Sequence, residues 1–261
     1  MTYESNLVIA GIVAEICVLV LTYVRSLHRL YPIFTVYLVW AIASDVSFIA
    51  APSLYKGKIN AYIVEIGIDS VLQFMILAEL MLATLKPVRN ALPSWIRALI
   101  PFFLAIAGAL LWPLAGFAVQ SNVDAHGYVL VVLQQTVSLL RVTFLLVLVA
   151  FSQFLSIGWR DRELQIASGL GFYSILSLVV WVLHTHQAVG PQYHWLDLIT
   201  SFGYLGTLAY WVVAFMQKEP ETRKISPQMV RFLVSIGGAV QAERLVLESV
   251  VKKKPGSHSH S

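Results

Sequence analysis

Six ionisable side chains lie within long stretches of sequence that are otherwise apolar, and they are the first candidates for chemistry. They are five carboxylates and one base: Glu15, Asp45, Glu65, Asp69, Glu79 and Arg141. Placing a charged group in apolar surroundings costs at least a few kcal/mol unless the group is paired. A chain that keeps six such groups therefore uses them for a site or for a strong structural contact.

The spacing of these residues predicts two polar helix faces. Glu65, Asp69 and Gln73 are four residues apart, and Gln134, Ser138 and Arg141 follow one another at intervals of four and three. Side chains three or four residues apart share one face of an α-helix. We therefore predict that the two polar faces look at each other or at a shared cavity.

Two interpretations of the buried charges stay open. In the structural one, Arg141 forms a buried ion pair that fixes helix packing, and removal of one partner should strongly destabilise the fold. In the functional one, a single arginine cannot neutralise five carboxylates. Carboxylates without a base are then protonated, or they pair with a proton, a metal cation or a cationic ligand.

A second group of polar residues, His184, His186, His194 and Asp197, lies within the segment HTHQAVGPQYHWLD. Two histidines that are two residues apart on a helix point to different faces, so the metal-binding signal is weak. We predict no metal site here. His184 is kept as a pH-sensitive or ligand contact at the mouth of a pocket.

The predicted ligand-binding residues are Arg141, Asp69, Glu65, Glu15, Asp45, His184 and Gln134. In this set Arg141 anchors an acid or a carboxylate ligand, and Asp69 and Glu65 face it. No catalytic residue is predicted, because the sequence contains neither the HExxH nor the GxSxG motif. Glu79 is left out, since we expect it to reach towards the inner headgroups.

The elements that must position these residues are long apolar helices. Of the 261 residues, 58% are hydrophobic and 12% are charged, whereas soluble domains are about 25% charged. Crossing a bilayer takes roughly 20 helical residues, and seven stretches qualify: 6–24, 31–51, 59–85, 96–119, 128–157, 164–186 and 195–216. The predicted fold class is an all-α integral membrane protein, with a seven-transmembrane-helix bundle in residues 1–216.

Basic residues in the connectors predict the orientation. The odd connectors carry Arg25, Arg29, Lys86, Arg89, Arg97, Arg160 and Arg162, whereas the even connectors carry Lys56 and Lys58. Because Lys and Arg in short loops resist translocation, the odd connectors belong in the cytoplasm. We predict a multi-pass protein of the cell membrane with its N-terminus outside and its C-terminus cytoplasmic.

The tail, residues 217–261, is predicted to carry a short amphipathic helix over 227–251. Ser226 and Pro227 suit a helix cap and first helical residue. The helix lies on the inner leaflet or is solvated, and it offers a surface for a cytoplasmic partner. No nucleic-acid partner is expected, since no aromatic residues interleave with the basic ones. Cys17, the one cysteine, is expected to be a small buried hydrophobe.

The helix count and the predicted orientation resemble the plan shared by microbial rhodopsins and G-protein-coupled receptors, in topology alone. A retinal Schiff base requires a lysine within the last helix, and residues 196–216 contain none. A retinal cofactor is therefore not expected, and the cofactor is unknown. The receptor signatures are missing as well, since the third stretch ends Ala83-Thr84-Leu85-Lys86-Pro87 and the seventh has no Asn-Pro pair.

Four classes of function remain. The favoured one is a small-ligand-binding sensor or receptor-like module with a polar intramembrane site open to the outside. The alternative is a proton- or cation-coupled small-molecule transporter that uses the surplus carboxylates, although seven helices do not divide into two equal inverted repeats. An enzyme is less favoured because no nucleophile and base pair is recognisable, and a structural subunit of a larger complex is the last class.

Overall fold

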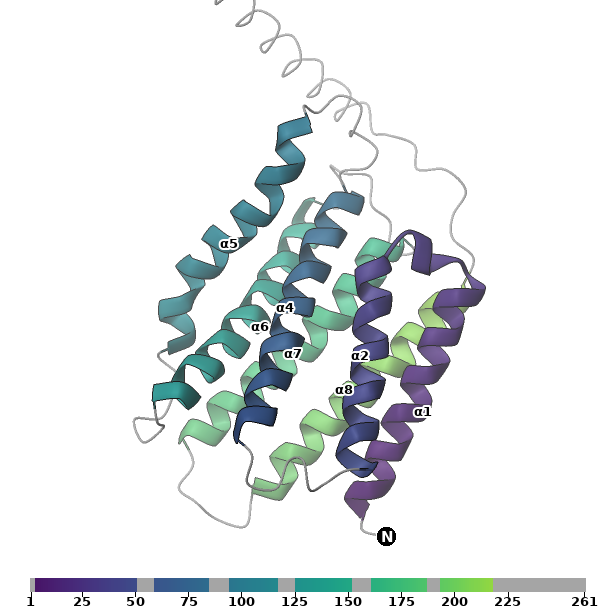
Figure 1. Ribbon diagram of the computed structural model, residues 1–261, viewed down its shortest axis with the longest axis vertical. Coiled ribbons are helices and arrows are strands. Elements are labelled where there is room, and N and C mark those ends of the chain that lie inside the picture. The colour runs from purple at the N-terminus through teal and green to yellow at the C-terminus, as the bar shows by residue number, and fades with distance from the viewer. Residues whose placement is uncertain are drawn as a thin grey trace, which may run out of the picture.

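The computed structural model of the chain describes residues 3–50, 59–84, 94–116, 125–151, 161–186 and 193–217. Within these ranges the protein is all-helical (Figure 1). The elements are α1 (Tyr3–Val24), the short 3-10 helix η1 (Leu27–Arg29), α2 (Pro32–Ala50), α4 (Ile59–Thr84), α5 (Ser94–Gly116), α6 (Ala125–Phe151), α7 (Arg162–His186) and α8 (Tyr193–Met216). Predicted and observed helix ends differ by at most three residues where both fall on described residues.

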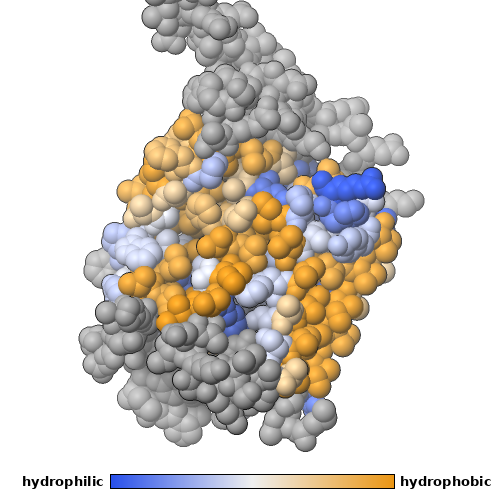
Figure 2. All heavy atoms as spheres, viewed as in Figure 1, coloured by the Kyte–Doolittle hydropathy of each residue, from blue (hydrophilic) through white to orange (hydrophobic). Residues whose placement is uncertain are grey.

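All seven long helices are long and apolar enough to cross a membrane. Their outward surface agrees with this, because large apolar side chains such as Val20, Phe102 and Leu110 are exposed. The face in Figure 2 is mostly apolar, with hydrophilic residues gathered between apolar surfaces. Exposed apolar area of this extent is typical of a surface that faces lipid. The protein is therefore a multi-pass membrane protein. The predicted tail helix, 227–251, lies outside the described residues.

Six of the helices form a closed ring. In the order α1, α2, α4, α6, α7 and α8, each helix packs against the next, and α8 packs back against α1. Of the described helices, α5 contacts only α4 and α6, so it lies outside the ring (Figure 1). A ring of six helices leaves room for side chains, or for a ligand, along its axis.

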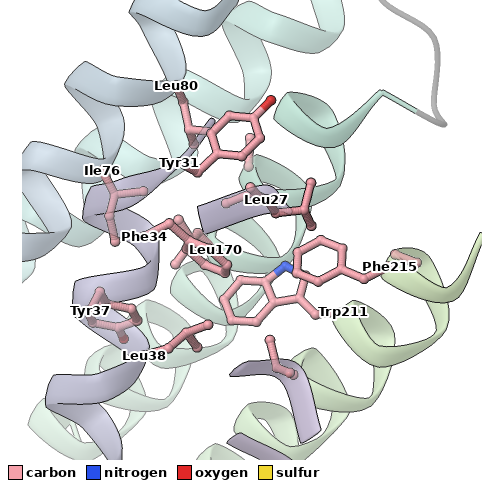
Figure 3. Close-up of a cluster of buried hydrophobic side chains, with 14 of the residues drawn as sticks. Leu27, Tyr31, Phe34, Tyr37, Leu38, Ile76, Leu80, Leu170, Trp211 and Phe215 are labelled. Atoms are coloured by element: carbon pink, nitrogen blue, oxygen red, sulfur yellow. The ribbon is translucent and has the colours of Figure 1, made fainter. Parts of the chain in front are cut away.

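A layer of apolar side chains fills the ring at the end that contains η1. Phe34 of α2 lies edge-on to Trp211 and Phe215 of α8, with ring centroids 5.1 and 6.2 Å away. Leu27 and Leu170 belong to the same buried cluster (Figure 3). We call these five residues the aromatic layer. Because interiors are close-packed, this layer separates the centre of the ring from that end of the bundle.

The aromatic layer depends on one helix contact that has no spare room. Gly169 of α7 stands against Trp211, and a Cβ atom at this position would collide with the indole ring. The indole nitrogen of Trp211 donates a hydrogen bond of 3.2 Å to the backbone oxygen of Gln165. Small residues let helices approach closely in membranes, and here the approach is what places Trp211 across the ring.

Two expectations from the sequence are wrong. Glu79 does not reach towards headgroups: it is 8% exposed, and its carboxylate accepts hydrogen bonds from the backbone nitrogens of Ile33 and Phe34 at 2.9 and 3.0 Å. The first N–H groups of a helix have no partner within that helix, so Glu79 of α4 caps the start of α2. Cys17 is exposed on α1 rather than buried.

The cap leads to a prediction for stability. Glu79→Ala should lower the free energy of unfolding by about 2 kcal/mol, because two buried N–H groups lose a charged acceptor. Glu79→Gln keeps one acceptor and should lose less. Thermal unfolding of the purified protein in detergent measures both, with Leu82→Ala as the control, since Leu82 is exposed on the same helix. Equal melting temperatures for wild type and Glu79→Ala would contradict the capping role.

Candidate functional site

The ring encloses a cavity of about 600 Å³. Its walls are formed by α1, α2, α4, α6, α7 and α8, and no residue of α5 contributes. The cavity begins near Leu7 and Leu198, at the end of the bundle that holds the N-terminus, and reaches Tyr37 and Arg141. The aromatic layer lies beyond it, so the cavity is a pocket rather than a channel through the described bundle.

Six of the seven predicted site residues line this one cavity, namely Glu15, Asp45, Glu65, Asp69, Gln134 and Arg141. They come from four different helices, and the fold brings them together. The side chain of His184, in the last turn of α7, lies outside the part of the chain that the structure describes. Its predicted place at the cavity mouth therefore stays a prediction.

Arg141 is the one basic side chain among the described residues that line the cavity. It is only 4% exposed. Its Nη2 donates a hydrogen bond of 2.9 Å to Ser138 on the same helix, and its guanidinium lies 6.0 Å from the ring centroid of Tyr173. Its Nε and Nη1 atoms are buried without a hydrogen-bond partner. A buried guanidinium with two unsatisfied nitrogens is costly to keep.

The structural ion pair is not found among the described residues. Asp69 is near enough to act on Arg141 electrostatically, yet its carboxylate is bonded elsewhere, since it accepts a hydrogen bond of 2.6 Å from Gln73. Glu15 cannot reach Arg141 through direct packing, because α1 and α6 stand on opposite sides of the ring and do not contact each other. Arg141 and the carboxylates therefore line the same cavity, and no hydrogen bond or ion pair joins them among the described residues.

Each of three carboxylates has one hydrogen-bond partner from a side chain. Tyr204 of α8 donates to Glu15, Ser44 of α2 donates to Glu65, and Gln73 donates to Asp69. The second oxygen of Glu15, Oε2, is buried and has no partner. The carboxylates therefore keep acceptor capacity that the described side chains do not use.

Sequence reasoning missed three tyrosines in the walls: Tyr37, Tyr173 and Tyr204. A signal was present, because residues 37, 41 and 44 on α2, and 200, 201 and 204 on α8, follow helical spacing and carry polar or small side chains. Tyrosine is ambiguous in a membrane helix, since it also marks the aromatic belts at the interfaces. Its place in the cavity is set by the partner helices.

In the described part of the chain, no three His, Cys, Asp or Glu residues lie close enough together to hold a metal ion. The side chains of the walls offer hydrogen bonding and ion pairing. Arg141 offers N–H donors for an anion or a carbonyl, and the carboxylates offer acceptors for a cation or a donor group.

The unsatisfied guanidinium predicts an unusual stability result. Arg141→Met should shift the melting temperature of the ligand-free protein by less than about 4 °C, which corresponds to roughly 1 kcal/mol in a chain of this size. The substitution removes unpaired buried donors and keeps much of the side-chain volume. Tyr204→Phe should lower the free energy of unfolding by about 1–3 kcal/mol, because both oxygens of Glu15 are then unpaired. A large loss in Arg141→Met would mean that Arg141 is needed for the fold.

Comparisons of the chain with family models, with curated proteins and with solved structures found no match. No relative therefore supplies a function by similarity. The function is inferred from the side chains of the cavity.

Proposed function

We propose that the protein is a small-ligand-binding module of the sensor or receptor type. A ligand enters the cavity between the six ring helices, bonds to its polar walls and changes the packing of the ring. The observation that carries this proposal is Arg141, whose Nε and Nη1 have no partner although the side chain is only 4% exposed. A ligand acceptor that approaches from the cavity is the partner that the protein itself does not provide.

The physical reason is the balance between stability and function. An unpaired buried charge lowers stability, and groups of this kind persist in membrane helices at sites that use them. Arg141 is held in place by Ser138 and by the ring of Tyr173, so it is positioned before a ligand arrives. A donor that is already oriented loses less conformational entropy on binding.

The size of the cavity supports a small organic ligand. Ligand pockets in proteins have volumes of roughly 300–1,000 Å³, and this cavity of about 600 Å³ falls within that range. The walls also carry aromatic surface from Tyr37, Trp40 and Tyr173. Aromatic walls with a few convergent polar groups are typical of small-molecule sites.

A proton- or cation-coupled transporter is the second candidate. The observation in its favour is charge: Glu15, Asp45, Glu65 and Asp69 line the cavity against one arginine. Transport requires a route to the other side of the membrane, however, and the aromatic layer fills the ring beyond the cavity. A receptor needs no such route, so the sensor is the first choice.

The proposed orientation places the cavity mouth outside the cell. The N-terminal end of α1 lies at the cavity end of the bundle, whereas η1 and the end of α8 lie at the opposite end (Figure 1). Arg25, Arg29 and Arg162 gather at that opposite end. The positive-inside rule favours a cytoplasmic position for it, which leaves the cavity open to the outside and the tail in the cytoplasm.

Helix α8 provides a route from the cavity to the tail. At the cavity it carries Tyr204, which is bonded to Glu15. At its other end, Arg162 donates to the backbone oxygens of Ala214 and Gln217 at 2.7 and 2.6 Å, and Arg25 donates to that of Met216 at 2.6 Å. We call Arg25 and Arg162 the arginine clasp. A shift of α8 at the cavity would strain the clasp, next to the start of the tail.

The ligand-binding proposal predicts a thermal shift. The full chain, purified in detergent, is screened against a broad set of small polar metabolites. At least one compound should raise the melting temperature, and the rise should grow with the concentration of that compound. Arg141→Gln should abolish that shift, whereas Arg29→Gln, at an exposed arginine far from the cavity, should keep it. If no compound in the set shifts the wild-type protein, the sensor proposal fails.

The clasp predicts a local effect on backbone exchange. The last carbonyls of a helix lack intrahelical partners, and cations near them are stabilising. Arg162→Gln should therefore speed hydrogen exchange of the amides in residues 211–217. Amides near Tyr204 should change little in the absence of ligand. Arg29→Gln serves as the matched control, and equal exchange in Arg162→Gln and wild type would show that the clasp does not hold the end of α8.

A further inference from the structure

Among the described residues that line the cavity, two buried groups have unused bonding capacity, and they stand on opposite walls. Arg141 lies on α6 and Glu15 on α1, and these helices are three places apart in the ring of six, with no contact between them. Both side chains are almost fully buried, at 4% and 1% exposure. Nε and Nη1 of Arg141 and Oε2 of Glu15 have no hydrogen-bond partner. One wall therefore lacks acceptors, and the opposite wall lacks a donor.

The surroundings of each group keep the two walls different. Arg141 is accompanied by the neutral polar groups of Ser138 and Gln134 on α6, and by Asp69 of α4, which acts on it electrostatically while its carboxylate bonds to Gln73. Glu15 is accompanied by Asp45 on the neighbouring helix α2, close to Gly11 of α1. Tyr204 already gives its hydroxyl hydrogen to the first oxygen of Glu15. The acidic wall can therefore take a further donor with more than one N–H, which is what an ammonium group provides.

We propose that the ligand is a small zwitterion of the amino-acid type, with its carboxylate towards Arg141 and its ammonium group towards Glu15 and Asp45. This inference rests on the proposed ligand-binding function and names its ligand class. A guanidinium N–H forms a strong, charge-assisted hydrogen bond with a carboxylate, and Nε and Nη1 of Arg141 both lack an acceptor. The ammonium group meets Oε2 of Glu15, and the aromatic walls suit a cation as well.

Ligands with a single charge fit less well. An anion would satisfy Arg141 but would add a negative charge to a cavity that already holds four carboxylates. A simple cation would satisfy Glu15 and leave Nε and Nη1 of Arg141 unpaired, at the full desolvation penalty of both. A zwitterion completes both walls and leaves the net charge of the cavity unchanged, and the partner at each end offsets the cost of removing that charge from water.

The experiment uses the full chain in detergent and a matched series of probes. The series contains ω-amino acids of increasing length, from glycine through 4-aminobutanoate to 8-aminooctanoate, together with leucine. Each amino acid is compared with the amine and the carboxylic acid of the same chain length. Binding is measured by titration calorimetry. At least one amino acid should bind about tenfold or more tightly than either of its one-charge analogues, a difference of roughly 1.4 kcal/mol.

The variants assign each end of the ligand to a wall. Arg141→Gln should weaken that amino acid and its carboxylic acid analogue by about tenfold, with little effect on the amine. Glu15→Gln should do the reverse. Glu79→Gln is the matched control for a buried carboxylate outside the cavity and should leave all three affinities unchanged. Where Arg141→Gln does not fold, Arg141→Lys, which keeps the charge without the paired N–H groups, replaces it.

Four results would overturn the inference. Equal affinity for an amino acid and its amine, insensitive to Arg141→Gln, would identify a plain cation as the ligand. Equal affinity for the carboxylic acid would identify an anion. If no probe binds but the metabolite screen yields a compound whose thermal shift depends on Arg141, the ligand class is wrong and the sensor proposal stands. If neither binds, both fail.

Discussion

The structure depends on one constraint: within a bilayer, every polar group must find its partner inside the protein. Most of the described side chains meet it locally. Thr22, Thr35, Thr136 and Ser174 donate to the backbone oxygen four residues earlier, and Glu79 satisfies the first N–H groups of α2 from a neighbouring helix. Arg141 and Glu15 do not fully meet it, although both are buried in the same ring. Elsewhere in the described bundle His28, Thr84 and Ser168 also hold a buried atom without a partner, but of these groups only Arg141 and Glu15 line the cavity.

The ring explains why Arg141 and Glu15 can line the same cavity without forming an ion pair. Helices three places apart around a closed ring cannot approach each other unless the ring collapses, and the aromatic layer resists collapse, since Trp211 spans from α8 to Phe34 on α2 and rests against Gly169 on α7. An apolar, close-packed layer has little freedom to deform. The layer is therefore the part of the ring that is most resistant to such a collapse.

The sequence predicts the seven helices and six of the residues that line the cavity, for a clear physical reason. Apolar length identifies a span, and three- and four-residue spacing identifies a face, so Glu65, Asp69 and Arg141 could be assigned to inward faces from their spacing alone. Partners that lie far apart in the chain could not be predicted. Tyr204 and Glu15 are 189 residues apart, and Glu79 meets α2 across 46 residues. Their contacts depend on the order of the helices around the ring, which periodicity does not contain. The exclusion of α5 from the ring is unpredictable for the same reason.

The position of α8 connects the binding proposal to an output. Its cavity face meets Glu15 through Tyr204, its middle forms the aromatic layer, and its end is held by the arginine clasp. A ligand that bonds to Glu15 would alter the contact between Glu15 and Tyr204, and would so change the forces on α8 as well as on α6, where Arg141 lies. A helix of 24 residues rises about 1.5 Å per residue. It can move as a rigid body and carry such a change from one end to the other. In the proposed mechanism α8 couples the cavity to the arginine clasp, and the coupling free energy would equal the difference in ligand-binding free energy between the clasped and released states.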